Sequence, residues 1–68
     1  MKVTINGKGD ELQDGMSVAD LLESRKIRVE MVTVELNDTM LHREQFPTAL
    51  LKEGDKIEFL YYMGGGML

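Results

Sequence analysis

The chain has 68 residues, a formal net charge of −4 and no cysteine, and a chain of this length forms one domain without room for an enzyme that has its own cleft. An acidic protein has the wrong sign to neutralise phosphates, which excludes nucleic acid as a partner, while the absence of cysteine excludes disulfides, thiol nucleophiles and thiolate metal sites. No apolar run approaches the roughly 20 residues that cross a bilayer, so we expect no membrane association and a soluble protein of the reducing cytoplasm, monomeric on its own.

The chain begins with a strand and a tight hairpin. Apolar and polar residues alternate from about residue 1 to residue 6, which is the period of a half-buried strand. Asn6 and Gly7 both tolerate the positive φ of a type I′ turn, so together they predict a two-residue hairpin. We expect a short second strand near residues 9–13, with Leu12 pointing inward.

A helix is predicted next, over about residues 17–26. Ser17 is a good N-cap, and Asp20 stands three residues later at the spacing of a capping box. The i, i+3, i+4 spacing gathers three apolar side chains on one helical face: Val18, Leu21 and Leu22. The segment therefore predicts an amphipathic helix with one face against a sheet.

Three further strands are predicted in the second half of the chain. Residues 31–36 alternate in polarity, and residues 39–41 are long enough only for a short strand. Residues 42–50 contain Pro47 and no clean period, so we interpret them as a loop with room for one irregular helical turn. Residues 56–62 form the clearest strand, because they are rich in aromatic and branched side chains.

These elements predict an α+β fold in which one mixed sheet of four to five strands packs on one main helix. Alternation along the last strand turns Ile57, Phe59 and Tyr61 toward the core. The expected core comprises the inward-facing apolar residues Val3, Ile5, Leu12, Val18, Leu21, Leu22, Val34, Leu36, Ile57 and Phe59.

The same alternation turns Leu60 and Tyr62 outward, beside Glu58. These residues lie just before the C-terminal end of the chain. Exposed apolar residues in such a position are typical of a surface that docks a partner. In the alternative interpretation, residues 42–50 cover these side chains and the residues belong to the core.

The last strand leads into three consecutive glycines, Gly64, Gly65 and Gly66. Glycine has no Cβ, so such a run can extend fully and enter a channel too narrow for other side chains. An inert, frayed end is the alternative interpretation, because glycine-rich termini are common. We expect a folded domain over residues 1–63 and a flexible Gly-rich tail over residues 64–68.

The order of elements and three segments carry a family resemblance: Val-Glu-Leu-Asn at 34–37, the turn and strand at 53–58, and the glycines at 64–66. Together they resemble the ThiS-type sulfur carriers of thiamine biosynthesis, which are ubiquitin-like proteins of the β-grasp fold. The resemblance extends over essentially the whole chain, and the last strand with its glycine tail is its most specific part.

In that family the C-terminal glycine carboxylate is adenylated and converted to a thiocarboxylate, which donates sulfur for thiazole formation. The resemblance implies that Gly66 is the acceptor and that Gly64 and Gly65 form a slender stem. The carrier is then no enzyme, has no catalytic residue and binds no cofactor or metal itself. An E1-like adenylyltransferase of the ThiF type would use ATP and Mg²⁺ to activate it. Further implied partners are a sulfur donor such as a cysteine desulfurase and a thiazole synthase of the ThiG type.

The C-terminus departs from the family pattern. Members usually end at the glycines, whereas Met67 and Leu68 follow Gly66 here. The free carboxylate of this chain therefore belongs to Leu68, not to a glycine. We expect a peptidase to remove Met67-Leu68, unless these two residues are foreign to the natural protein.

Other functions are compatible with the same residues. A carrier of the same fold can serve molybdopterin or amino-acid (cysteine or homocysteine) biosynthesis, and a ubiquitin-like protein modifier would be conjugated to lysines. An interaction module with an inert tail is a further alternative, because one fold hosts many functions. His42 is the single histidine and has no clustered partner at ligand spacing, so we expect a surface side chain and no metal site.

Overall fold

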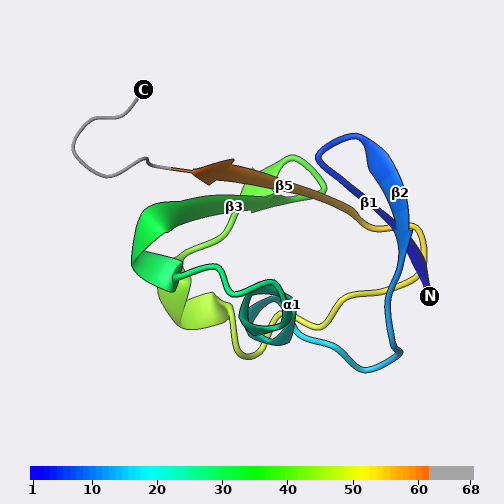
Figure 1. Ribbon diagram of the computed structural model, residues 1–68, viewed down its shortest axis with the longest axis horizontal. Coiled ribbons are helices and arrows are strands. Elements are labelled where there is room, and N and C mark those ends of the chain that lie inside the picture. Colours follow the sequence, from blue (N-terminus) through cyan, green and yellow to red (C-terminus); the bar gives the residue numbers. More distant parts are fainter. Residues whose placement is uncertain (62–68) are drawn as a thin grey trace.

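In the computed structural model, which describes residues 1–61, a five-stranded mixed sheet packs with one face on an α-helix (Figure 1). The strands are β1 (Lys2–Ile5), β2 (Lys8–Glu11), β3 (Val32–Leu36), β4 (Thr39–Met40) and β5 (Lys56–Tyr61), and the helix is α1 (Val18–Ser24). Two 3₁₀ turns cover Val29–Met31 and Arg43–Gln45. The predictions for Tyr62, Met63 and the tail over residues 64–68 lie outside the described residues.

The first and last strands lie side by side in the centre of the sheet. The strand order is β2-β1-β5-β3-β4, with β1 parallel to β5 and every other pair antiparallel. The helix lies on one face of this sheet, as the ribbon in Figure 1 shows, and within residues 1–61 the other face carries no helix. This is the β-grasp arrangement that the sequence predicts.

The hairpin between β1 and β2 confirms the type I′ prediction. Asn6 and Gly7 have φ values of 51° and 84°, the positive values that such a turn requires. A two-residue turn leads straight into the next strand, so β2 begins at Lys8 and ends at Glu11, earlier than predicted. Leu12 follows β2 and is only partly buried against the core.

Helix α1 begins at the predicted capping box. The backbone N–H of Asp20 donates to Ser17 Oγ at 3.0 Å, and the backbone N–H of Ser17 donates to the Asp20 carboxylate at 3.0 Å. The helix ends at Ser24, two residues before the predicted end, because Lys26 adopts a left-handed φ of 60°. A short helix of this kind covers only part of the sheet.

The core confirms most of the predicted apolar set. Leu36, like Leu12, is only partly buried. The sequence missed Val32, Phe46 and Leu51, which are buried as well; Phe46 comes from the segment predicted as a loop. The buried apolar side chains are Val3, Ile5, Val18, Leu21, Leu22, Val32, Val34, Phe46, Leu51, Ile57 and Phe59.

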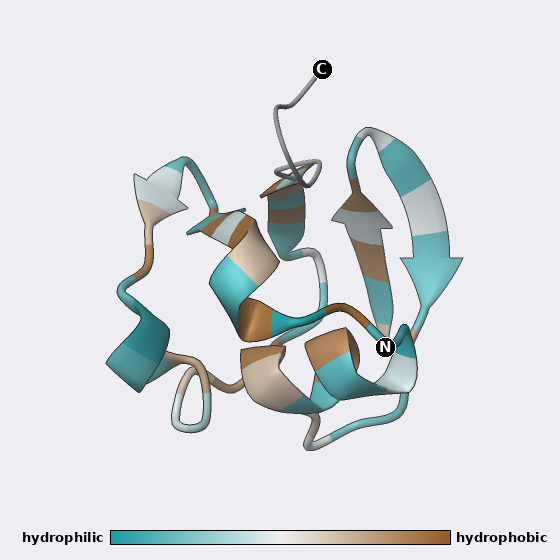
Figure 2. Ribbon diagram, turned by 60° about the vertical axis from the view of Figure 1, so that its left-hand side comes forward, coloured by the Kyte–Doolittle hydropathy of each residue, from teal (hydrophilic) through white to brown (hydrophobic). Residues whose placement is uncertain are grey.

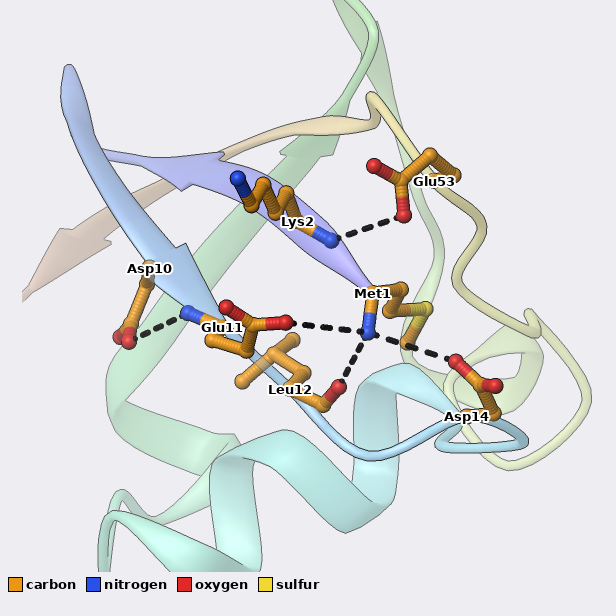
Figure 3. Close-up of polar contacts among 7 residues, drawn as sticks. All are labelled: Met1, Lys2, Asp10, Glu11, Leu12, Asp14 and Glu53. Atoms are coloured by element: carbon orange, nitrogen blue, oxygen red, sulfur yellow. Dashed lines mark hydrogen bonds and ion pairs between the residues drawn. The ribbon is translucent and has the colours of Figure 1, made fainter.

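Polar contacts fasten the N-terminus to its neighbours (Figure 3). The amino group of Met1 donates to the Leu12 carbonyl at 2.7 Å and lies 3.3 Å from the Asp14 carboxylate. The backbone N–H of Lys2 donates to the Glu53 carboxylate at 2.9 Å. The Met1 contacts hold the start of β1 to the segment that follows β2, and the Lys2 contact holds it to the turn that precedes β5.

The buried carboxylate of Asp55 joins two turns. It accepts hydrogen bonds from the backbone N–H of Lys52 at 2.7 Å and from the Asn37 side-chain amide at 3.0 Å. Asn37 Oδ1 in turn accepts the backbone N–H of Lys56 at 2.9 Å. The network fixes the point where β5 starts, and thereby the register of the strand that leads to the tail.

Candidate functional site

The C-terminal end of β5 is the part of the fold that presents the predicted tail. Strand β5 lies between β1 and β3, and its pairing with β3 runs to Val32↔Tyr61. Leu60 and Tyr61 are exposed by 59% and 52%, whereas Ile57 and Phe59 are buried. The side chains at this end of the strand are therefore available to a partner on both faces of the sheet.

The face opposite the helix carries two of the three predicted docking residues, Glu58 and Leu60. Cross-strand pairing places Leu60 opposite Thr33 and Glu58 opposite Glu35 on this face. Its exposed apolar side chains are Leu60 and, on β4, Met40, which is 57% exposed. The outward orientation of Leu60 beside Glu58 is confirmed, and residues 42–50 do not bury Leu60; the third predicted docking residue, Tyr62, lies outside the described residues.

Three carboxylates gather on this same face, which the sequence did not predict. Oxygen atoms of Glu35, Asp38 and Glu58 lie within 4.8 Å of one another. Lys56 Nζ lies 2.8 Å from Asp38, and this hydrogen bond and charge raise the pKa of Lys56. The pairing of β3 with β5 places Glu35 opposite Glu58, and Asp38 comes from the turn that follows β3, so the available signal was the strand register. The face beside Leu60 is consequently acidic.

Tyr61 corrects the prediction that its side chain belongs to the core. It lies on the helix side with Ile57 and Phe59, as alternation requires, but it is not in the core. In Figure 1, helix α1 lies under the middle of the sheet and away from the C-terminal end of β5, and the Tyr61 ring is half exposed. Its edge contacts the Phe59 ring, with centroids 6.3 Å apart and an interplanar angle of 68°.

A groove of about 450 Å³ adjoins Tyr61 on this side, between the β1–β2 hairpin and the end of β5. Apolar parts of Ile5, Phe59 and Tyr61 line it, and Lys8 and an Asp10–Arg25 ion pair provide its polar boundary. The hydropathy colouring in Figure 2 shows the contrast between the apolar end of β1 and the polar strand β2. The groove is thus a mixed apolar and charged surface next to the last described residue.

The Asp10–Arg25 pair ties β2 to the end of the helix. The backbone N–H of Glu11 donates to the Asp10 carboxylate at 2.7 Å, and the Arg25 guanidinium contacts the same carboxylate. The hydrogen bond from Glu11, followed by that from Arg25, lowers the pKa of Asp10. The pair fixes the position of the hairpin over the groove.

The remaining site predictions fall elsewhere. The acceptor Gly66 and the stem residues Gly64 and Gly65 lie outside residues 1–61. His42 is exposed before the second 3₁₀ turn, where its backbone N–H donates to Gln45 Oε1 at 2.7 Å. Within the described residues no helix is long and apolar enough to span a membrane.

Within residues 1–61, the sheet order, the one parallel pair and the helix on one face define a ubiquitin-like β-grasp protein. Solved structures agree with this class. The crystal structure of the thiamine biosynthesis protein ThiS from Geobacter metallireducens has a TM-score of 0.83 and 45% sequence identity, covering 97% of this chain and 100% of that chain. The solution structure of the Geobacter protein gives a TM-score of 0.81 and covers all of this chain.

Sequence comparison then identifies the family. The chain matches the ThiS family over residues 3–66, and it belongs to that family. A thiazole synthase of Magnetococcus marinus is 32% identical over 97% of this chain. The chain spans only 20% of that protein's length. A protein of Pyropia yezoensis named ycf40 is 33% identical, with 97% of this chain and 93% of that protein covered.

Proposed function

We propose that this protein is a sulfur carrier for thiamine biosynthesis, and that Gly66 is adenylated and then converted to a thiocarboxylate. The single observation that carries the proposal is the family match, which runs from the β-grasp domain through the glycines to residue 66. The 45% identity to a thiamine biosynthesis protein with the same fold supports the same pathway.

The chemistry explains why glycine suits the acceptor position. Adenylation joins a carboxylate oxygen to the α-phosphorus of ATP and releases pyrophosphate, and a sulfur nucleophile then displaces AMP from the acyl carbon. The enzyme must hold the carboxylate in line with the phosphate and neutralise the developing charge with cations. A stem of Gly64 and Gly65 allows close approach, since neither residue brings a Cβ into the channel. The carrier presents the group and its partner performs the catalysis, with ATP and Mg²⁺.

The open sheet face supports a docking role beside the tail. Leu60 is exposed next to Glu58, with the carboxylates of Glu35 and Asp38 close by. An apolar side chain next to clustered negative charge fits an adenylyltransferase surface with an apolar depression bordered by basic residues. We assign this face, together with Tyr62, to the first contact with the activating enzyme.

The match to thiazole synthases supports a thiazole synthase as the enzyme that receives the sulfur. In the Magnetococcus marinus protein and in one from Paramagnetospirillum magneticum, a segment similar to this chain makes up 20% of a longer protein named thiazole synthase. Covalent linkage raises the effective concentration of one module near the other. We therefore propose that a separate thiazole synthase receives the sulfur from this carrier. We also propose that the reactions take place in the cytoplasm.

Mass spectrometry of the protein isolated from cells tests the proposal. A carrier will show the mass change of one oxygen replaced by one sulfur, on a chain that ends at Gly66. Branched peptides on lysines would identify a protein modifier instead, and an unmodified chain under thiamine starvation would contradict the carrier function.

A reconstituted reaction tests the position of the acceptor. The 68-residue chain and a form that ends at Gly66 are each incubated with the adenylyltransferase and ATP, and pyrophosphate release is followed. We expect only the shorter form to react, because Met67 and Leu68 carry side chains that a glycine-sized channel excludes. Equal rates for the two forms would show that no peptidase step is needed.

A further inference from the structure

The edge of β5 that faces β1 is open at its C-terminal end. The pairing of β1 with β5 stops at Ile5↔Ile57, whereas β5 continues to Tyr61. Beyond that point the chain of β1 enters the Asn6-Gly7 turn and leaves the sheet edge. Within the described residues, the end of β5 therefore has a strand neighbour only on the β3 side.

Backbone contacts identify the groups that face the open edge. The N–H of Asn6 donates to the Ile57 carbonyl at 2.9 Å, and the N–H of Phe59 donates to Asn6 Oδ1 at 2.8 Å. Backbone groups of alternate residues point to the same side of a strand, so the Phe59 carbonyl and the Tyr61 N–H also point toward this side. Neither group has a hydrogen-bond partner within residues 1–61.

The hydrogen bonds of β3, on the other side of β5, support this direction of the Phe59 backbone groups. Val34 lies across from Phe59, and its carbonyl accepts the N–H of Leu41 at 3.0 Å on the β4 side. Val34 and Phe59 therefore form a non-hydrogen-bonded pair, in which neither residue directs its backbone groups at the other. The Phe59 carbonyl is thus left for a partner on the β1 side.

The groove lies beside these free groups. Phe59 and Tyr61 contribute their rings to its apolar lining, and Lys8 stands on its boundary outside the ion pairs of residues 1–61. The Asp10–Arg25 pair closes the groove on the side of the helix. An extended segment along β5 would therefore find backbone partners, an apolar depression and one unpaired cation within a few residues.

We propose that an extended segment of the activating adenylyltransferase adds to the open edge of β5 at Phe59 and Tyr61 and places an apolar side chain in the groove. Strand addition of this kind draws affinity from main-chain hydrogen bonds and specificity from side-chain pockets. The inference rests on the proposed function, because an enzyme that takes up the tail must contact the end of β5. A carboxylate near that apolar side chain would pair with Lys8.

Two substitutions separate the backbone donor from the ring. Tyr61→Pro removes the ring and the N–H, whereas Tyr61→Ala removes the ring alone. Proline is tolerated on this side because the Tyr61 N–H makes no ladder bond to β3. The measurement is the Kd for the adenylyltransferase with ATP absent. We expect Tyr61→Pro to bind roughly 3- to 10-fold more weakly than Tyr61→Ala, the cost of one interfacial hydrogen bond.

Amide hydrogen exchange in the unsubstituted chain gives an independent measurement. The Tyr61 amide should exchange at least about tenfold more slowly in the complex than in the free chain, since it becomes hydrogen-bonded. Equal Kd values for the two variants, together with an unchanged exchange rate at Tyr61, would overturn strand addition even if the complex forms and the tail is adenylated. Protection that rises with the concentration of the free carrier would also overturn it, because a second copy would then occupy the edge. Failure of the unsubstituted chain to bind or react would overturn both this inference and the proposed function.

Discussion

Lys26 is the residue at which the backbone is least suited to its side chain. It adopts a φ of 60°, a left-handed conformation that favours glycine. The reason is the end of α1: the N–H of Lys26 donates to the Glu23 carbonyl at 3.0 Å, and the N–H of Ile27 donates to the Leu22 carbonyl at 2.9 Å. This pair of bonds is a Schellman motif, whose left-handed position is usually occupied by glycine.

Lys26→Gly should therefore stabilise the protein. Relief of the left-handed strain outweighs the greater entropy of glycine in the unfolded chain, so we expect the free energy of unfolding to rise by about 0.5 to 1 kcal/mol. Urea denaturation measures the change, and Lys26→Ala is the control, because it removes the same charge and keeps the Cβ. If both variants gave the same stability, the lysine charge and not the backbone would be responsible.

The titration of Asp10 should reveal how much its contacts with Glu11 and Arg25 stabilise the folded chain. Its pKa is lowered in the folded chain, by the Glu11 N–H first and Arg25 second. A carboxylate with a lowered folded pKa contributes stability above its unfolded value of 3.8, and that contribution is lost as the pH falls through the folded pKa. The stability difference between the unsubstituted chain and Asp10→Asn should shrink below that pH. In an Arg25→Gln background the difference should be smaller but not absent, since the Glu11 bond remains; a difference independent of pH would contradict the assignment.

At the scale of elements, the short helix determines which strand residues are free to bind partners. Helix α1 spans Val18–Ser24 and buries the middle of β5, leaving Tyr61 half exposed on one face, while Leu60 is exposed on the helix-free face. Two neighbouring residues of one strand therefore serve two separate surfaces. Each surface can be altered without disturbing the core.

Leu60→Asp tests the helix-free face as the first docking surface. The variant should keep a melting temperature within a few degrees of the parent, because surface substitutions change stability by about 0.5 kcal/mol or less. We expect its Kd for the adenylyltransferase to rise by roughly tenfold or more, since an apolar contact is lost and a charge is added to an acidic face. Leu50→Asp is the matched control, as Leu50 is also 59% exposed but pairs with Ser17 at the start of α1. Equal weakening by both variants would argue against a localised docking face.

Local signals in the sequence predicted the elements well, and long-range pairing accounts for what they missed. The capping box at Ser17 and the Asn6-Gly7 turn depend on residues within a few positions, so their chemistry is readable from the chain alone. The exposure of Tyr61 depends on where a separate helix ends. The proximity of Glu35 to Glu58 depends on the register between β3 and β5. No local sequence pattern predicts this proximity or the exposure of Tyr61.

At the scale of the whole molecule, charge should govern how fast the carrier finds its activating enzyme. The chain carries a formal net charge of −4, and one acidic cluster lies beside Leu60 on the proposed docking face. Opposite charge on a partner accelerates encounter over distances of about the Debye length, which falls from roughly 14 Å at 0.05 M salt to about 4 Å at 0.5 M.

The association rate constant should therefore fall by about tenfold or more across that salt range, while the dissociation rate changes little, because salt screens encounter more than close contact. Stopped-flow fluorescence measures both rates. The double variant Glu35→Gln, Glu58→Gln should bind more slowly at low salt and show a flatter salt dependence. A matched variant, Glu23→Gln with Glu30→Gln, removes the same charge from α1 and the first 3₁₀ turn, outside the acidic cluster, and should retain most of the dependence. Equal flattening by the two double variants would show that net charge, and not the acidic face, directs the encounter.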